Sequence, residues 1–229
     1  MHKNPFSKLK KREWTLWSIS LLTVVISNIL ADNASFSTIA GTITGVTALI
    51  FVARGDVWGQ ILTVAFSFLY ATTSYEFRYW SEIITYLGMT MPIAVMSIVS
   101  WLRHPYEQGK NEVKIHRLSS RQIWLMIFIA IAVTVSFCFL LKALNTPNLF
   151  FSTVSVTTSF LASYLMLFRS SYYAVAYAAN DTVLIILWIL AAIKDFSYFP
   201  MIICFVMFFV NDIYGFISWK KREKKQGLR

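Results

Sequence analysis

The sequence predicts an all-α integral membrane protein, and three observations support this fold class. Hydrophobic residues make up 57% of the 229 residues, whereas charged residues make up only 14%. The apolar residues gather in long runs, and a run of about 20 suits a helix that crosses a bilayer core about 30 Å thick. The runs also lack the period-two alternation of transmembrane strands. We therefore expect a bundle of membrane helices.

Eight apolar runs define the expected spans, taken in chain order. The second and third runs are separated only by Arg54, Gly55 and Asp56, and their combined length requires a turn there. The expected spans are Trp14–Ala31, Phe36–Ala53, Val57–Thr73, Tyr79–Trp101, Ile123–Leu141, Leu149–Phe168, Tyr172–Ala191 and Phe199–Trp219. The first run follows a basic segment but lacks a convincing small-residue cleavage site, so we interpret it as a retained helix rather than a signal peptide.

The net charge of +10 is distributed in a way that indicates a membrane protein and not a nucleic-acid partner. With eight spans and both termini cytoplasmic, eighteen of the 21 Lys and Arg residues lie on one side, leaving only Arg78, Lys142 and Lys194 on the other. This is the positive-inside pattern. The basic clusters 8–12 and 220–225 are then expected to face the anionic headgroups of the lipid bilayer.

One span, Tyr173–Ala191, organises the functional interpretation because it carries Asn180 and Asp181 near its middle. A charged carboxylate at the centre of a membrane helix costs about 2.5–3.5 kcal/mol on insertion scales, so such groups usually face a bundle interior or a watery cavity. Asn180, Leu184 and Trp188 are spaced by four residues and share one helical face. This face offers an amide and an aromatic plane to a ligand.

The last span repeats the pattern with Asn211 and Asp212, which are followed by Tyr214. In the first half of the chain, Gln60 and Tyr70 belong to a polar seam on one helical face, and Tyr86 lies in the next span. Two interpretations stay open at this point. The polar residues either line a substrate cavity near the membrane midplane or form interhelical hydrogen bonds that only hold the bundle together.

The spans after the first fall into two similar groups of three. Both groups close on Ser-Trp, at Ser100-Trp101 and Ser218-Trp219, which are 118 residues apart. At the same offset Tyr70 matches Trp188. We predict an N-terminal segment 1–34, a first repeat 35–101, a loop and linker helix 102–148, a second repeat 149–219 and a basic tail 220–229. Because each group has an odd number of spans, the linker helix makes the repeats parallel, which is a transporter architecture.

The 3+1+3 layout, the extra N-terminal helix and the segment NDIYGFISW from Asn211 resemble the PnuC family of bacterial vitamin transporters. The layout is also similar to that of SWEET sugar transporters. The resemblance extends from about Ile39 to Lys221. It implies a multi-pass protein of the bacterial inner (cytoplasmic) membrane with both termini cytoplasmic. One departure is that the position matching Asn180 in the first half, near Leu62-Thr63, has no asparagine.

The resemblance implies a uniporter that takes up a small heteroaromatic vitamin precursor, nicotinamide riboside first of all, by facilitated diffusion with trapping by cytoplasmic phosphorylation. Thiamine and deoxynucleosides remain alternative substrates, and a membrane-embedded enzyme or a non-catalytic membrane subunit are alternatives of other classes. No cofactor is expected. Cys138, Cys204 and the three histidines lack metal-ligand spacing, so we expect no metal either. A homo-oligomer remains open. The expected substrate-binding residues are Gln60, Tyr70, Tyr86, Asn180, Asp181, Trp188, Asn211, Asp212 and Tyr214.

Overall fold

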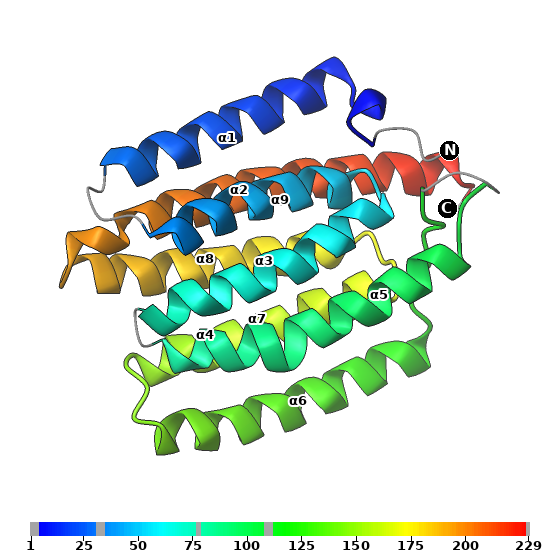
Figure 1. Cartoon of the computed structure of the whole chain (residues 1–229). Coiled ribbons are helices and arrows are strands. Elements are labelled where there is room, and N and C mark those ends of the chain that lie inside the picture. Colours follow the sequence, from blue (N-terminus) through cyan, green and yellow to red (C-terminus); the bar gives the residue numbers. More distant parts are fainter. Residues whose placement is uncertain (1–4, 31–34, 77–78, 108–111, 228–229) are drawn as a thin grey trace.

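A computed structural model describes residues 5–30, 35–76, 79–107 and 112–227, and these residues form helices joined by short connections (Figure 1). Arg78 and residues 108–111, which enter the charge and loop assignments above, lie outside the described residues. The elements are η1 (Pro5–Lys8), α1 (Lys11–Leu30), α2 (Phe36–Ala53), α3 (Val57–Glu76), α4 (Trp80–Thr85), η2 (Tyr86–Thr90), α5 (Met91–Arg103), α6 (Ser120–Ala143), α7 (Leu149–Leu167), α8 (Tyr173–Ala192), η3 (Phe196–Tyr198) and α9 (Phe199–Lys225).

The all-helical prediction is confirmed. In the described part of the chain, seven helices are long and apolar enough to cross a membrane, with α4, η2 and α5 counted as one. The one expected span without such a counterpart is the third, Val57–Thr73, which corresponds to α3; this helix has 20 residues but falls short in hydropathy. The polar side chains that lower its hydropathy include Gln60 and Ser67, and both are buried inside the bundle. The count of eight membrane spans therefore depends on α3.

Six helices form a ring around the centre of the molecule. In the order α2, α3, α5, α7, α8 and α9, each helix packs on the next, and α9 returns to α2. The two remaining helices lie outside this ring. The helix α1 packs against α2 and α9, whereas α6 packs against α7, and Figure 1 shows them at opposite edges of the molecule. The ring brings polar residues of both sequence halves together.

Both ends of the described chain lie at the same end of the bundle, which we call the termini end (Figure 1). The short turns after α2 and α7 also lie there, and they need left-handed backbone at Gly55 (φ 65°) and Arg169 (φ 57°). Glycine takes this conformation at little cost, whereas arginine does so uncommonly. The opposite end, called the distal end, holds the connections after α3, α6 and α8. Lys142 and Lys194 lie near it, as the charge pattern predicts.

The two tryptophans that close the repeats make matching contacts near the termini end. The Trp101 indole donates to the carbonyl of Met166 in the last turn of α7 at 3.3 Å. The Trp219 indole donates to the carbonyl of Val52 in the last turn of α2 at 2.9 Å. Each half therefore contributes a tryptophan that caps a helix of the other half, α7 or α2. Two parallel repeats related by an axis along the membrane normal would give this exchanged pair, although the division into repeats itself remains a prediction.

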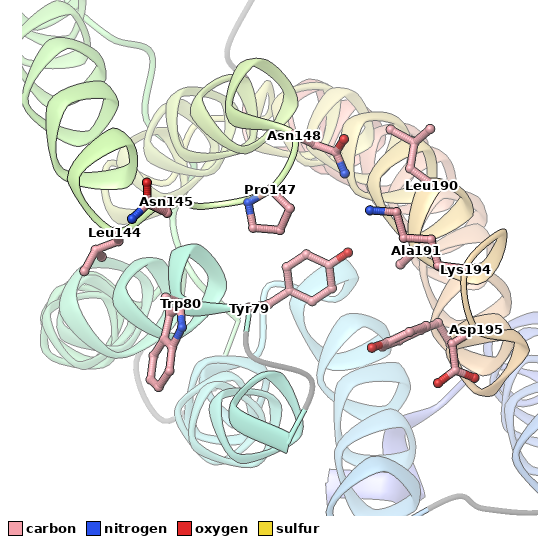
Figure 2. Close-up of a pocket in the computed structure, with 11 residues that line it drawn as sticks. Tyr79, Trp80, Leu144, Asn145, Pro147, Asn148, Leu190, Ala191, Lys194 and Asp195 are labelled. Atoms are coloured by element: carbon pink, nitrogen blue, oxygen red, sulfur yellow. The ribbon is translucent and has the colours of Figure 1, made fainter.

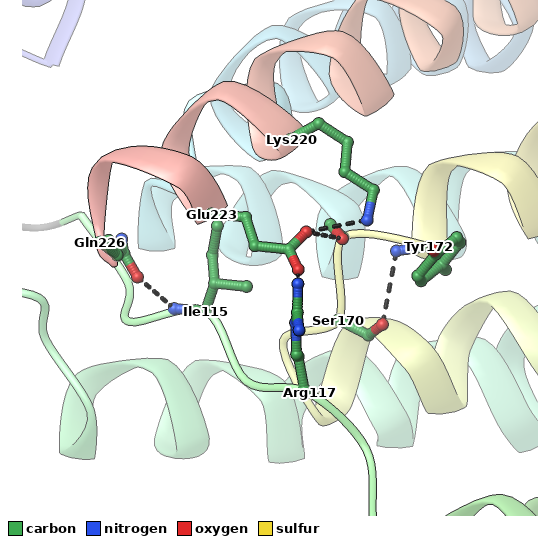
Figure 3. Close-up of polar contacts among 8 residues, drawn as sticks. Ile115, Arg117, Ser170, Tyr172, Lys220, Glu223 and Gln226 are labelled. Atoms are coloured by element: carbon green, nitrogen blue, oxygen red, sulfur yellow. Dashed lines mark hydrogen bonds and ion pairs between the residues drawn. The ribbon is translucent and has the colours of Figure 1, made fainter. Parts of the chain in front are cut away.

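A segment of the α5–α6 connection, residues 112–119, crosses the termini end, and we call it the strap. The amide of Val113 donates to the Gly55 carbonyl at 2.9 Å, and the amide of His116 donates to the Arg169 carbonyl at 3.1 Å. The strap thus joins the turns of both halves. Glu223 of α9 makes further polar contacts at this end (Figure 3). Its carboxylate accepts hydrogen bonds from Arg117 at 2.8 Å, Lys220 at 2.9 Å and Ser171 at 2.7 Å.

Candidate substrate cavity

An internal cavity of about 50 Å³ lies inside the helix ring and receives side chains from both halves of the sequence. Its polar lining consists of Gln60, Thr63, Tyr86, Thr90, Tyr177, Asn180, Asp181 and Asp212. Its apolar lining consists of Gly45, Ala48, Leu49, Val52, Phe66, Met166 and Phe208. Typical ligand pockets have volumes of roughly 300–1,000 Å³. The cavity is therefore smaller than a typical ligand pocket in this conformation, and it must widen to hold a nucleoside-sized ligand.

Three polar side chains present unused hydrogen-bonding atoms in the cavity lining. The Oδ1 atom of Asn180 accepts from the hydroxyls of Thr158 at 2.8 Å and Ser159 at 3.1 Å. These two bonds orient the amide, so its NH₂ group is left to donate. In the part of the chain that the structure describes, Nε2 of Gln60 and Oδ2 of Asp181 have no hydrogen-bond partner. The lining therefore offers two amide donors and a carboxyl acceptor.

The cavity carries acidic groups without a basic counterpart. The carboxyl groups of Asp181 and Asp212, from α8 and α9, both line the cavity. None of the described residues that line the cavity is Lys, Arg or His. Because an isolated buried charge is costly, the pair favours a ligand that brings positive charge and disfavours one that brings negative charge.

An aromatic series closes the cavity toward the distal end. Tyr86, in the lining, packs against Tyr70 with ring centroids 4.4 Å apart. The Trp188 indole donates to the Tyr70 hydroxyl at 3.2 Å, and Tyr79 packs on the Trp188 ring at 4.8 Å. Tyr70 and Trp188 were expected to line the site. The structure instead places both in this seal, where they are almost completely buried.

Beyond the aromatic seal lies a larger depression of about 340 Å³, which we call the distal vestibule. Figure 2 shows the side chain of Tyr79 projecting into it, with Asn148 and Lys194 across from it. Tyr79 thus lines the vestibule and also packs edge-to-face against Trp188. A ligand that enters from this end must displace the series Tyr79–Trp188–Tyr70.

A second seal closes the cavity toward the termini end. Val52 and Met166 line the cavity, and their carbonyls accept the indole hydrogen bonds of Trp219 and Trp101. Tyr173 packs on Trp219 with ring centroids 4.7 Å apart, and all three aromatic side chains are buried. Buried aromatic side chains therefore pack at both ends of the cavity in this conformation.

Two of the expected site residues lie away from the cavity. The Asn211 amide donates to the Ser20 hydroxyl of α1 at 2.9 Å and to the Met207 carbonyl at 2.8 Å. The Tyr214 hydroxyl donates to Glu13 of α1 at 3.2 Å. Both therefore face the extra N-terminal helix. The structure brings together Gln60, Tyr86, Asn180, Asp181 and Asp212, and places Tyr70 and Trp188 in the adjoining seal.

Sequence reasoning missed several lining residues. Tyr177 lies three positions before Asn180 on α8, so the same helical-face argument could have included it. Thr63 lies three positions after Gln60 and Thr90 lies four positions after Tyr86, so the same argument could have included both. Gly45 carried no signal, although a Cβ atom there would lie 2.4 Å from the Phe208 ring. Its lack of a side chain makes room for that ring in the cavity wall.

Comparison with known proteins gives a consistent result. The family model described as nicotinamide mononucleotide transporter matches residues 35–221. A curated relative, the nicotinamide riboside transporter PnuC of Neisseria mucosa, is 25% identical over 221 residues, which cover 93% of this chain and 84% of the relative. A solved structure described as a crystal structure of the vitamin B3 transporter PnuC superposes with a TM-score of 0.82. The two sequences are 22% identical, and the superposition covers 95% of this chain and 94% of the chain in that structure. At this level of identity the likeness supports the fold alone.

Proposed function

The chain belongs to the nicotinamide mononucleotide transporter family and is a multi-pass membrane transporter rather than an enzyme, and we propose that it carries nicotinamide riboside by facilitated diffusion. We further propose that it lies in the bacterial cytoplasmic membrane with both termini cytoplasmic and that phosphorylation in the cytoplasm traps the substrate. The observation that carries the substrate proposal is the acidic, amide-lined cavity inside the ring.

The hydrogen-bonding groups of the cavity suit this substrate. A nicotinamide carboxamide has one carbonyl acceptor and one NH₂ donor, and the ribose adds hydroxyls. Gln60 and Asn180 supply amide donors, and Asp181 supplies an acceptor. Tyr86, Phe66 and Phe208 supply aromatic surface. A few placed polar groups in a largely aromatic and apolar pocket are the usual source of small-molecule specificity.

The charge of the cavity favours the riboside over the mononucleotide named in the family description. The nicotinamide ring of the riboside is cationic, so the Asp181–Asp212 pair attracts it. The mononucleotide would add a phosphate group. No lysine, arginine or histidine lies among the described lining residues to balance that phosphate. Placing it beside two carboxyl groups would require it to lose its hydration without compensation.

The two seals support a mechanism of alternating access. The aromatic series closes the distal side, and the Trp101–Trp219–Tyr173 group closes the termini side. Opening one seal at a time would expose the cavity to one side of the membrane at a time. A single cavity that alternates in this way equilibrates its substrate without an energy source, so accumulation depends on phosphorylation after entry.

A binding panel with the purified protein tests the substrate proposal. The panel contains nicotinamide riboside, thiamine, a deoxynucleoside and nicotinamide mononucleotide. We expect the riboside to bind most tightly and the mononucleotide least tightly. Tightest binding of thiamine or of the deoxynucleoside would transfer the proposal to that alternative substrate. Tightest binding of the mononucleotide would contradict the charge argument. Chemical conversion of any ligand would favour the enzyme alternative.

A further inference from the structure

A second depression, of about 390 Å³, lies at the termini end where α1 begins and α2 and α9 end. We call it the basic groove. It is separate from the substrate cavity and has the opposite charge. Six cationic side chains line it, namely Lys10, Arg12, Arg54, Lys221, Arg222 and Lys225, against two acidic ones, Glu13 and Glu112. The groove therefore has an excess of four positive charges.

Both acidic side chains already have cationic partners inside the groove. Glu13 pairs with Arg54 at 2.5 Å and also accepts from Tyr214. Glu112 pairs with Arg222 at 2.6 Å. In the part of the chain that the structure describes, no carboxylate pairs with Lys10, Arg12 or Lys221. Their charges converge from α9 and from the start of α1.

Arg222 gives an independent sign that an acceptor belongs in the groove. Its Nε atom is buried and has no hydrogen-bond acceptor among the described residues, because the neighbouring Glu112 carboxylate lies 2.6 Å from a terminal nitrogen of Arg222 and not against Nε. A buried donor of a charged group that lacks an acceptor is destabilising. A phosphate oxygen is the acceptor that a guanidinium group matches best, together with a carboxylate. The charge and this open donor both favour an anionic ligand.

The surface beside the groove shows where the rest of the ligand would lie. Ile213, Ile217 and Lys221 are spaced by four residues and share one face of α9. Ile213 and Ile217 are each 46% exposed, and Ile217 also lines the groove. This face of α9 therefore runs from an apolar surface within the membrane span to the cationic side chain of Lys221 at the groove. This pattern matches an amphiphile with an anionic headgroup.

We propose that the basic groove binds the phosphate headgroup of an anionic phospholipid, with an acyl chain along Ile213 and Ile217. The bound lipid would bridge α1 and α9, and it would stabilise the contact between the extra N-terminal helix and the ring. This proposal is independent of the transported substrate. It concerns the leaflet at the termini end, whichever way the protein is oriented.

The test measures lipid retention and thermal stability of the full chain. Purified protein is incubated with phosphatidylglycerol or phosphatidylcholine and analysed by native mass spectrometry. Its melting temperature is measured in nanodiscs of phosphatidylcholine with and without phosphatidylglycerol. We expect phosphatidylglycerol to be retained preferentially and to raise the melting temperature. Each cation near an anionic lipid surface contributes about a fivefold change in affinity.

Two matched variants give the control. The groove variant K10Q/R12Q/K221Q should lose most of the retained phosphatidylglycerol and most of the rise in melting temperature. The variant R103Q/K114Q/R121Q removes three exposed cations from the same end outside the groove and should behave like the unmodified protein. Equal losses in both variants would overturn the site in favour of a general surface charge. If the groove variant does not fold, the single variant R12Q should show weaker retention of the lipid.

Inorganic phosphate distinguishes the two sources of the anion. In phosphatidylcholine nanodiscs at matched ionic strength, sodium phosphate should leave the melting temperature at its value in sodium chloride. A rise equal to that given by phosphatidylglycerol would overturn the lipid proposal and assign the groove to a soluble phosphate ligand. Absence of any preference for phosphatidylglycerol in both measurements would overturn the site altogether.

Discussion

At the scale of single residues, Asn180 provides the sharpest test of the cavity. We expect Asn180→Ala to weaken binding of nicotinamide riboside by about 1–3 kcal/mol, or roughly five- to 150-fold, because it removes a donor from a dry pocket. Stability should also fall, since the amide accepts from Thr158 and Ser159. Ligand affinity and melting temperature are to be measured on the same purified protein.

Asn211 is the matched control for Asn180. It is also a buried asparagine with two hydrogen bonds, but these go to Ser20 and to the Met207 carbonyl, outside the cavity. Asn211→Ala should lower the melting temperature by an amount similar to Asn180→Ala and leave affinity unchanged. If both variants bind the riboside as tightly as the unmodified protein does, the polar residues are packing groups and the proposed site is wrong.

Because Asp181 and Asp212 are acidic, we predict that the cavity prefers a cationic ligand to a neutral one. Asp181→Asn keeps the shape of the side chain and removes its negative charge. We expect it to weaken binding of nicotinamide riboside and to have little effect on the dihydro form, whose ring is neutral. Competition binding with the two ligands measures this difference. An equal loss for both ligands would mean that Asp181 acts only as a hydrogen-bonding group.

At the scale of the elements, the strap and the C-terminal part of α9 form one stabilising unit. Glu223 is buried and holds Arg117, Lys220 and Ser171 (Figure 3). We expect Glu223→Gln to lower stability by about 1–2 kcal/mol, a value reduced for the partial exposure of its cationic partners. Denaturation of the purified protein measures it. Lys224→Gln, at the next position, which is exposed, should change stability little. An equal loss of stability in that variant would contradict the stabilising role of the Glu223 contacts.

The sequence predicted the helices better than their ends and interruptions. The apolar runs located α2 and α7 almost to the residue because each run stops at a basic turn. The run ending at Trp219 gave no sign that α9 continues to Lys225. That extension is held by tertiary contacts, such as the hydrogen bonds between Gln226 and the strap residues Val113 and Ile115. The π-helical turn at Tyr86–Thr90 likewise has no signature in the apolar pattern.

The candidate site was predictable where one helical face decided it. Asn180 and Asp181 both reach the cavity because α8 is buried on a broad face. Asn211 and Asp212 are equally adjacent, but they separate, since Asp212 faces the cavity and Asn211 faces α1. The sequence shows the spacing along a helix. It does not show which face of α9 the extra helix covers, and this is why Asn211 and Tyr214 were assigned to the site.

At the scale of the whole molecule, the arrangement of the ends predicts the membrane orientation. Arg54, Arg169 and the strap lie at the termini end, whereas Lys142 and Lys194 lie near the distal end. By the positive-inside rule, we propose that the termini end faces the cytoplasm. A cysteine at Lys114 should be shielded from an impermeant thiol reagent in intact cells, and one at Asn145 should react. The reverse labelling pattern would invert the proposed topology, and the unmodified protein is the control.

We propose that this chain alone moves its substrate through the cavity without an energy source. The most direct measurement follows radiolabelled nicotinamide riboside into proteoliposomes that contain only the purified protein. We expect the internal concentration to rise to the external one and to stop there, with the ligand chemically unchanged and with slower uptake for Asn180→Ala. Accumulation above the external concentration, conversion of the ligand or the absence of protein-dependent flux would contradict facilitated diffusion by this chain.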